Sequence, residues 1–410
     1  MFSIFKSFST ELKFYLIMNT FFSFGNALSG VFLSVFLWKL DKSYSLLANY
    51  SLYWSISIIF SFGLCAWLAR KTSPMITMRY GFVSYLITYV IMLSFHESLD
   101  QHIILLGAGM GLSISLYSVG MHMAILDLTT NDKREQFLYI EGILSTIGGV
   151  IAPLLSGILI SNFHGMAGYY VVFIATCVFF VLSFVFSLKV KGKHIPAKSY
   201  FWEVIKNPSP EWKKMYVIMV GDGIVSGVYF TFLISMITYK VAGGELNLGI
   251  YNTITQIVSI IAFAILAKYS KPEYRIAIFG IGAVSLLLSS VFLSVYPVLI
   301  GLIIFGLMEP IASNMIITTM NAMIYASIEK DPQYKEKRLD YIIIREIPLG
   351  LGRILGVVLF LWMRKYFDFD QLLPVSFSLF PIVFVLMVPL LFIVWKKSGH
   401  MHQNVNIPKG

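Results

Sequence analysis

The sequence contains few charged residues and almost no cysteine. Asp, Glu, Lys and Arg together account for 13% of its 410 residues, whereas hydrophobic residues account for 57% and the mean hydropathy is +0.78. This composition excludes an ordinary soluble enzyme and is typical of a membrane protein. The two cysteines, Cys65 and Cys177, lie far apart in apolar runs, which excludes a disulfide framework and a CxxC redox or metal site.

The sequence also lacks the short motifs that identify most enzymes. It has no nucleophile dyad, no metal-ligand spacing, no dinucleotide-binding fingerprint and no GxxxxGK[ST] motif for ATP. We therefore expect no catalytic activity, no cofactor and no bound metal, so that any transport must be driven by an ion or substrate gradient. The net charge of +10 does not indicate a nucleic-acid partner, because the basic residues lie in short loops between apolar runs.

What the chain has in abundance is long apolar segments. A helix needs about 20 mostly apolar residues to cross a bilayer, and this length predicts twelve spanning helices. They cover residues 14–38, 46–68, 76–95, 102–126, 136–161, 167–188, 215–239, 247–267, 275–295, 298–326, 341–363 and 371–395.

The basic residues predict the orientation of these helices. With a cytoplasmic N-terminus, the termini and the even-numbered loops hold 24 of the 31 Lys and Arg residues, and the odd-numbered loops hold five. The remaining two, Arg345 and Arg353, lie within the eleventh helix. Since cytoplasmic loops carry an excess of basic residues, we expect a multi-pass protein of the plasma (cytoplasmic) membrane with both termini in the cytoplasm.

The chain divides into two similar halves. The polar interval 189–214 separates six predicted helices from six others, so we expect a bundle at 1–190, a cytoplasmic linker at 191–213, a second bundle at 214–397 and a tail at 398–410. The segment SGVFLS at 29–34 recurs as SGVYFT at 226–231, and AWLARKTSP at 66–74 recurs as AILAKYSKP at 264–272. Such repeats predict an all-α membrane protein built from two pseudosymmetric six-helix bundles, with its site near the midplane between them.

These features resemble the major facilitator superfamily of secondary transporters over essentially the whole chain. The family carries a glycine, an acid four residues later and then basic residues in the loop between helices 2 and 3; here Ala66 and Arg70 occupy the first two positions. The basic residue that the family carries in helix 4, often linked to proton coupling, is absent from ILLGAGMGLS at 104–113. The resemblance implies the two-bundle fold and transport by alternating access.

Helix 5 carries a second part of the resemblance. Antiporters of the family have a glycine four residues before a GPxxGG block, and here Gly148 is followed by Ala152, Pro153 and Gly157. Each family glycine is kept or replaced by a small residue. Because small residues let helix backbones approach closely, we expect these four residues to form a helix-packing motif.

Charged residues at the cytoplasmic ends of the helices suggest a gate. In the family, the acid of the helix 2–3 loop engages the start of helix 11, and the equivalent loop of the second half engages helix 5. Here the loops carry Arg70 and Lys268, the start of helix 11 carries Asp340 and Glu346, and the start of helix 5 carries Glu135 and Glu141. The resemblance therefore implies a cytoplasmic gate of exchanged polarity, with Glu346 meeting Arg70.

Three further charged residues are expected deeper in the membrane. Asp222, Glu309 and Arg353 lie farthest from the ends of their helices, at about 1.5 Å of rise per residue. Family resemblance places helices 7 and 10 beside the cavity, so we expect Asp222 and Glu309 to carry protons and Arg353 to bind substrate or to act as a counter-ion. The alternative is a permanently paired structural network. Pro310, which opens the preceding helical turn, favours a functional role for Glu309.

Polar amides within the predicted helices are candidates for binding substrate together with Arg353. They are Asn26, Asn252, Gln256 and Asn314. Each can instead form an interhelical hydrogen bond. The 34 Phe, 23 Tyr and 7 Trp residues are interpreted first as packing and membrane-interface residues, with an aromatic cavity for amphipathic molecules as the alternative.

The sequence therefore predicts a monomeric secondary transporter that exports a small amphipathic solute in exchange for protons. Two alternatives remain open within transport: a lipid or glycolipid flippase, and a proton-coupled importer of a sugar-like nutrient. A non-transporting sensor would need a soluble signalling domain, which the linker and the tail are too short to contain.

Overall fold

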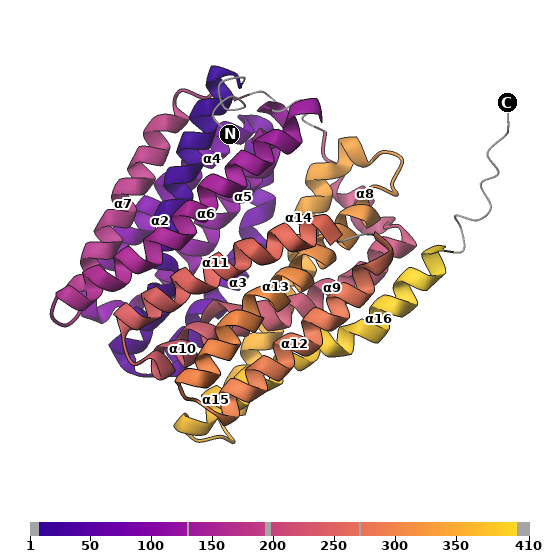
Figure 1. Cartoon of the computed structure of the whole chain (residues 1–410). Coiled ribbons are helices and arrows are strands. Elements are labelled where there is room, and N and C mark those ends of the chain that lie inside the picture. Colours follow the sequence, from indigo (N-terminus) through magenta and orange to yellow (C-terminus); the bar gives the residue numbers. More distant parts are fainter. Residues whose placement is uncertain (1–7, 129–130, 193–197, 270–271, 400–410) are drawn as a thin grey trace, which may run out of the picture.

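The structure, a computed structural model, describes residues 8–128, 131–192, 198–269 and 272–399, and all regular secondary structure in these residues is helical. The first half contains α2 (Thr10–Asp41), α3 (Tyr44–Lys71), α4 (Pro74–Phe95), α5 (Ile103–Leu128), α6 (Asn131–Asn162) and α7 (Ala167–Ser187). A short helix, α8 (Phe201–Lys206), lies in the polar interval between the halves. Figure 1 shows the long helices running roughly alongside one another.

The second half contains α9 (Pro210–Val225), a π-helical segment η2 (Ser226–Leu233), α10 (Ile234–Ala242), α11 (Glu245–Tyr269), α12 (Arg275–Val295), α13 (Leu299–Ile328), α14 (Tyr334–Met363), α15 (Phe369–Leu379) and α16 (Ile382–Gly399). The segments α9, η2 and α10 follow one another without a gap, as the predicted seventh helix requires. Two short 3₁₀ helices, η1 (His96–His102) and η3 (Pro272–Tyr274), lead into α5 and α12.

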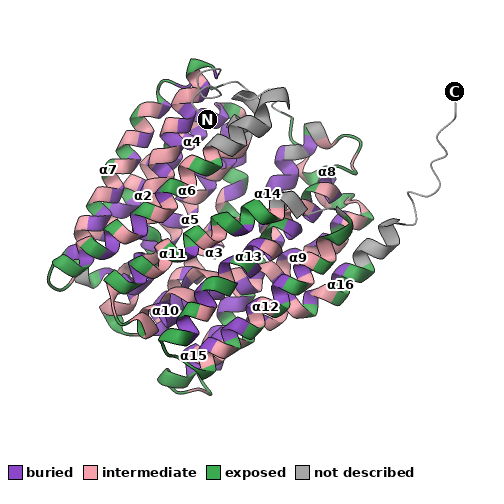
Figure 2. Ribbon diagram, viewed as in Figure 1, coloured by how far each residue is buried: buried purple, intermediate pink, exposed green. Residues whose placement is uncertain are grey.

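Eleven of the segments in the described residues are long and apolar enough to cross a membrane. The predicted eleventh helix, 341–363, lies within α14, a 30-residue helix with a charged first half that is not among those eleven. Figure 2 shows exposed residues along the outer faces of the helices, and many of them are large and hydrophobic, such as Phe60, Val90 and Leu288. The predicted all-α membrane architecture is confirmed.

Serine residues define where several helices begin. The hydroxyl of Ser73 accepts a hydrogen bond from the Ile76 N–H at 3.2 Å, and Pro74 occupies the first turn of α4, where its missing N–H is not needed. Ser209 and Pro210 repeat this arrangement at α9, with a bond from the Trp212 N–H at 3.2 Å. These caps satisfy backbone donors that the first turn of a helix leaves free.

Small residues bring helix backbones close together, both within and between the halves. A Cβ atom on Gly81 of α4 would lie 2.8 Å from the backbone nitrogen of Tyr117 on α5, so only glycine fits there. Between the halves, α6 packs against α11 and α3 packs against α14. A Cβ atom on Gly249 of α11 would lie 2.6 Å from the carbonyl oxygen of Pro153 on α6. Close backbone contact of this kind is how membrane helices associate.

Candidate functional site

A cavity of about 310 Å³, which we call the central cavity, lies between α2, α3, α4 and α5 of the first half and η2 of the second half. None of its lining residues carries a charge. They are Asn26, Ser29, Gly30, Leu33, Ser34, Tyr50, Trp54, Tyr85, Tyr89, Met110, Ile114 and Thr231. Aromatic faces, hydroxyl groups and one amide therefore surround the space, which suits an uncharged molecule with both apolar and hydrogen-bonding parts.

Hydroxyl groups hold the walls of this cavity together. Ser29 and Tyr89 are hydrogen bonded at 2.5 Å and join α2 to α4. Ser34 donates to the Thr231 carbonyl oxygen at 3.1 Å and joins the two halves. Ser34 and Thr231 are also the last residues of the repeated segments SGVFLS and SGVYFT, so equivalent residues of the two repeats meet here. The contact places the cavity beside the pseudosymmetry axis between the halves.

The π-helical turn of η2 makes further carbonyl groups available to the first half. The Ser51 hydroxyl of α3 donates to the Gly227 carbonyl oxygen, while the Thr231 hydroxyl reaches back to the Ser226 carbonyl oxygen at 2.8 Å. π-helical turns of this kind occur frequently at functional sites. Here the turn supplies the part of the second half that faces the cavity.

Beside the cavity lies a cluster of two acids and two arginines, all from the second half. The Glu346 carboxylate accepts from the Arg345 guanidinium at 3.1 Å and from the Arg353 guanidinium at 3.4 Å. Asp222 of α9 interacts electrostatically with both arginines and with Glu346. Two positive and two negative side chains give the cluster a formal charge of zero, which lowers the cost of burying them.

Arg353 joins the cluster to the cavity. Its guanidinium carbon lies 5.3 Å from the centre of the Trp54 indole ring, a cation–π distance. Trp54 lines the cavity from α3. The backbone at Arg353 is also close to η2, because a Cβ atom on Gly227 would lie 2.7 Å from the Arg353 Cα atom. The predicted substrate residue Arg353 thus contacts an aromatic residue of the cavity wall and is not itself one of the lining residues.

The other predicted proton carrier, Glu309, lies apart from this cluster. Within the described part of the chain it forms no ion pair, and the Ser313 hydroxyl donates to its carboxylate at 2.7 Å. It is close enough to the hydroxyl groups of Tyr229 and Tyr251 to interact with them electrostatically. Glu309 is therefore a carboxyl group in a neutral polar environment, whereas Asp222 lies among charges.

Glu141 has a comparable environment in the first half. Its carboxylate accepts from the Asn19 side-chain amide at 2.8 Å, and the Asn19 carbonyl oxygen accepts from the Tyr117 hydroxyl. This chain of polar groups joins α6, α2 and α5. The sequence predicted a contact with Lys268, but the side chains of Lys268 and Glu135 lie outside the described residues.

One end of the bundle carries the linker between the halves, and we call this end the linker face. Here the Asp340 carboxylate accepts from the Arg70 guanidinium at 2.7 Å, from the Ser199 hydroxyl at 3.1 Å and from the Tyr200 N–H at 3.1 Å. Arg70 thus pairs with Asp340 rather than with Glu346, the partner expected from the sequence. Glu346 lies nearly two helical turns farther along α14, where the two arginines engage it.

Further charged contacts hold the linker against the second half. The Lys337 ammonium lies 2.8 Å from the Glu203 carboxylate of α8 and 3.4 Å from the Asp331 carboxylate, and the Tyr200 hydroxyl donates to Glu336. Burial alone would raise the pKa of Asp331. Hydrogen bonds from the Gln333 N–H, the Tyr341 hydroxyl and Lys337 outweigh burial and hold the pKa below its usual value.

The opposite end of the bundle carries a second set of contacts between the halves. The Glu245 carboxylate at the start of α11 accepts from Lys39 of α2, from the Tyr169 hydroxyl of α7 at 2.9 Å and from the Tyr239 hydroxyl of α10 at 3.3 Å. Gly243, with a φ of 78°, makes the tight turn from α10 to α11. The halves are therefore bonded to each other at both ends.

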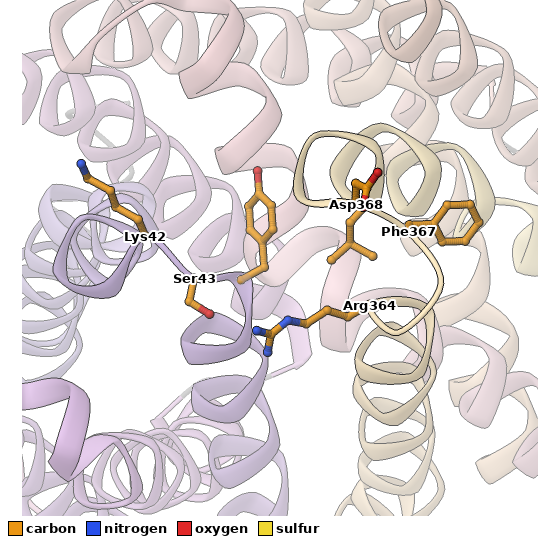
Figure 3. Close-up of a pocket in the computed structure, with 7 residues that line it drawn as sticks. Lys42, Ser43, Arg364, Phe367 and Asp368 are labelled. Atoms are coloured by element: carbon orange, nitrogen blue, oxygen red, sulfur yellow. The ribbon is translucent and has the colours of Figure 1, made fainter.

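A second cavity, of about 330 Å³, opens at this opposite end. Figure 3 shows Arg364 reaching toward Ser43 of the other half. The residues that line this second cavity are Lys42, Ser43, Tyr44, Arg364, Phe367, Asp368 and Leu372. Unlike the cavity at Trp54, this one is bordered by charged side chains of both signs.

The four amide residues that were predicted to bind substrate do not all line one cavity. Asn26 lines the central cavity. The Asn314 amide donates to the Ser259 carbonyl oxygen at 3.1 Å and to its hydroxyl at 2.9 Å, which joins α13 to α11. The Asn252 amide donates to the Leu248 carbonyl oxygen within α11 at 2.8 Å, and Gln256 lies near Gly149 of α6. These three residues do not line the central cavity.

The predicted packing motif of α6 faces two neighbours. A Cβ atom on Gly157 would lie 2.9 Å from the Glu245 carbonyl oxygen of α11, whereas one on Gly148 would lie 3.5 Å from the Phe24 Cα atom of α2. Ala152 is fully buried. Gly157 and Pro153 therefore hold α6 against the second half, whereas a Cβ atom at Gly148 would fit in ordinary van der Waals contact with Phe24.

Sequence reasoning missed most of the aromatic and hydroxyl residues of the cavity. Tyr50 and Trp54 on α3, and Tyr85 and Tyr89 on α4, are pairs of aromatic residues four positions apart. Residues at this spacing lie on one face of a helix. Two such pairs on consecutive predicted helices were a detectable signal, but the interpretation of aromatic residues as packing concealed it.

Comparisons with known proteins agree with this architecture. The family model described as the Major Facilitator Superfamily matches residues 77–333, which is more than half of the chain. Uncharacterized protein YqgE of Bacillus subtilis is 26% identical over 371 residues, which cover 90% of this chain and 86% of that protein. The staphylopine export protein of Staphylococcus aureus is 27% identical over 233 residues, which cover 53% of this chain and 55% of that protein.

Solved structures show the same fold at lower sequence identity. The nucleoside transporter NupG has a TM-score of 0.66 at 15% identity, and a mutant of the same transporter has a TM-score of 0.68 at 16% identity. Each alignment covers 94% of this chain and all of the matched chain. Together with the family model, the helical architecture and the membrane-length segments, these likenesses establish that the chain belongs to the major facilitator superfamily, a superfamily of multi-pass membrane transporters.

Proposed function

We propose that this transporter exports a small, uncharged amphipathic solute by alternating access and exchanges it for protons. The observation that carries the proposal is the central cavity, because it lies in the first half where η2 of the second half meets it, carries no charge and is lined by aromatic and hydroxyl groups. Its volume of about 310 Å³ is at the lower end of the range for small-molecule sites. The direction of transport is supported by the likeness to the staphylopine export protein.

Carboxyl groups in neutral surroundings support proton coupling. Glu309 and Glu141 each accept a hydrogen bond from an uncharged side chain, Ser313 and Asn19 respectively. Such a group can gain or lose a proton without breaking an ion pair. We assign proton transfer first to Glu309, because it lies in the second half near the hydroxyl groups of Tyr229 and Tyr251. Asp222 is a weaker candidate, because two arginines already compensate its charge.

A second candidate function is uptake of a small ring-bearing nutrient. The specific observation in its favour is the combination of aromatic faces with hydroxyl groups in the cavity, which suits a ring that carries hydrogen-bonding substituents. The fold is also that of a nucleoside transporter. Proteoliposomes loaded on one side with radiolabelled compound distinguish the two functions by the direction of accumulation in an imposed pH gradient.

Gly30 offers a direct test of the cavity. A Cβ atom there would meet no atom within 4 Å, so Gly30→Leu adds a side chain to the cavity without a backbone clash. We expect this variant to fold normally and to lose transport by at least tenfold. Gly63 of α3 is the matched control, since it also has open space around its Cβ position and does not line the cavity.

The test begins by finding a transported compound. The purified protein is heated with a panel of drugs, nucleosides, sugars, amino acids and glycolipids, because a compound that binds the native state raises its unfolding temperature. Flux of the best stabiliser is then measured for Gly30→Leu, Gly63→Leu and Glu309→Gln. Equal flux in the two leucine variants would show that the cavity is not on the transport path, and accumulation by Glu309→Gln that still follows the pH gradient would remove Glu309 as proton carrier.

A further inference from the structure

Trp54 contacts two parts of the molecule that differ in chemistry. Its indole ring lines the uncharged cavity, and the Arg353 guanidinium of the second half lies over the same ring at 5.3 Å from its centre. A cation within about 6 Å of an indole centre is attracted by the π electrons. The Trp54 ring therefore contacts both the space for the solute and the charged cluster of α9 and α14.

Arg353 depends on this ring because its other contacts are incomplete. Its hydrogen bond to Glu346 is 3.4 Å long, which is beyond the usual range for such bonds. Its Nε atom is buried and has no hydrogen-bond partner among the described residues. The stacking contact with Trp54 is thus a large part of what fixes the guanidinium, and a small rotation of the indole changes the position of the positive charge.

The backbone at Trp54 is packed closely against α5. A Cβ atom on Gly107 of α5 would lie 3.1 Å from the Trp54 nitrogen, and one on Gly111 would lie 2.7 Å from the Trp54 carbonyl oxygen. Helices α3 and α5 are therefore packed backbone to backbone at this residue. This packing limits movement of the Trp54 backbone relative to α5 and leaves its side chain as the part that can adjust to a solute.

We propose that Trp54 is a positioning residue that transmits occupancy of the cavity to the charged cluster. When an aromatic ring of the solute stacks against the Trp54 indole, the indole turns, and Arg353 then shifts relative to Glu346 and Asp222. This inference rests on the proposed function, since it assigns the solute to the cavity, and it adds a second proton-binding group in addition to Glu309, namely the charged cluster, whose proton affinity responds to the solute.

The groups around Arg353 determine the effect of its displacement. Asp222 comes from α9, Arg345 and Glu346 come from α14, Trp54 comes from α3, and Arg345 also interacts with the Tyr325 hydroxyl of α13. When Arg353 moves away, the two carboxylates share the positive charge of Arg345 alone. The cluster then binds a proton more readily, because a carboxylate is more easily protonated without a nearby cation.

The test uses a ring that is attached to the protein, so that it does not depend on the identity of the solute. Cys65 and Cys177 are replaced by alanine, and Gly30→Cys is labelled with benzyl methanethiosulfonate, which places a phenyl ring in the cavity. The unfolding temperature is measured as a function of pH, with and without the label. The quantity compared is the pH at the midpoint of its change. Gly63→Cys, labelled in the same way, is the control outside the cavity.

We expect the label at position 30 to shift this midpoint by about half a pH unit, a roughly threefold change in proton affinity. The label at position 63 should leave it unchanged. In Trp54→Leu the shift should disappear, and in Trp54→Phe, which keeps an aromatic face of weaker attraction for cations, it should be reduced. The phenylalanine variant carries the comparison if the leucine variant does not fold.

Two outcomes would overturn the proposal. A shift of the same size in Trp54→Leu or Trp54→Phe would show that the cluster senses the cavity without the indole. No shift with Trp54 present would show that the cavity and the cluster are not linked. Both outcomes are separate from the proposed function, because the flux of Gly30→Leu and Gly63→Leu tests the cavity without reference to the cluster.

Discussion

The ion pair between Arg70 and Asp340 allows a quantitative prediction. Removing Arg70 and removing Asp340 should lower the unfolding free energy by different amounts, because the two side chains differ in burial and in their remaining partners. The Asp340 side chain is 1% exposed and the Arg70 side chain is 12% exposed. Removing one member of a buried ion pair costs about 3–5 kcal/mol of unfolding free energy, since the other charge stays buried without compensation. The perturbations to compare are Arg70→Gln and Asp340→Asn.

The hydrogen bonds around Asp340 determine the size of each effect. In Arg70→Gln the carboxylate keeps two uncharged donors, the Ser199 hydroxyl and the Tyr200 N–H, so we expect the lower end of that range, about 3 kcal/mol. In Asp340→Asn the remaining charge belongs to Arg70, which can extend its side chain toward water. We expect this variant to lose about 1–2 kcal/mol.

The double variant shows whether the two residues act as a pair. With both charges removed, no buried charge lacks a partner, and we expect a loss of about 2 kcal/mol, well below the sum of the single losses. The assay is chemical unfolding of the purified proteins in detergent micelles at pH 7. Single losses that add within about 0.5 kcal/mol, or an Asp340→Asn variant that is less stable than Arg70→Gln, would refute the reasoning.

Three further predictions concern packing, the opposite end of the bundle and pH. Gly249→Val should cost about 1–3 kcal/mol of unfolding free energy, because its Cβ would meet the Pro153 carbonyl oxygen at 2.6 Å. The control is Gly142→Val, where the space is open. Equal stability of the two variants would contradict the prediction. Glu245→Gln should cost only about 1 kcal/mol, since the Lys39 side chain is 30% exposed, and thermal unfolding in detergent measures the loss. Asp331 has a lowered pKa in the folded state, so its contribution is present above its unfolded pKa of about 3.9 and is lost as pH falls through the folded value. The unfolding temperature should therefore fall less steeply between pH 5 and pH 3 in Asp331→Asn than in the parent. An equally steep fall in both proteins would contradict the contribution of Asp331.

The sequence predicted the architecture well because that architecture depends on long apolar segments and repeats, which can be read one segment at a time. The hydrophobic length of each span and the repeat of SGVFLS as SGVYFT were sufficient for the fold. The partner of Arg70 depended on finer geometry. Both Asp340 and Glu346 lie on α14, and six residues of separation decide which of them reaches α3 and which lies beside Arg353.

The candidate site was harder to predict because its residues are ordinary for a membrane protein. Asparagine attracts attention in an apolar helix, yet Asn314 bonds to Ser259 and lies away from the cavity. Tyrosine and serine are common in such helices, so Tyr89 and Ser29 gave no sign that they lie together. Whether a polar side chain joins two helices or faces an open space depends on how the helices are rotated, and composition does not encode that rotation.

The hydrogen bond between Ser34 and Thr231 joins two halves that differ in chemistry. The two residues occupy equivalent positions of the repeated segments SGVFLS and SGVYFT, so the surroundings of the two halves can be compared at this point. Eleven of the twelve residues around the central cavity come from the first half, whereas Asp222, Arg345, Glu346 and Arg353 all come from the second. Around the central cavity the first half supplies a neutral, aromatic surface and the second half supplies the charged cluster. Exchanging halves between distant relatives should therefore transfer solute preference with the first half and ion dependence with the second.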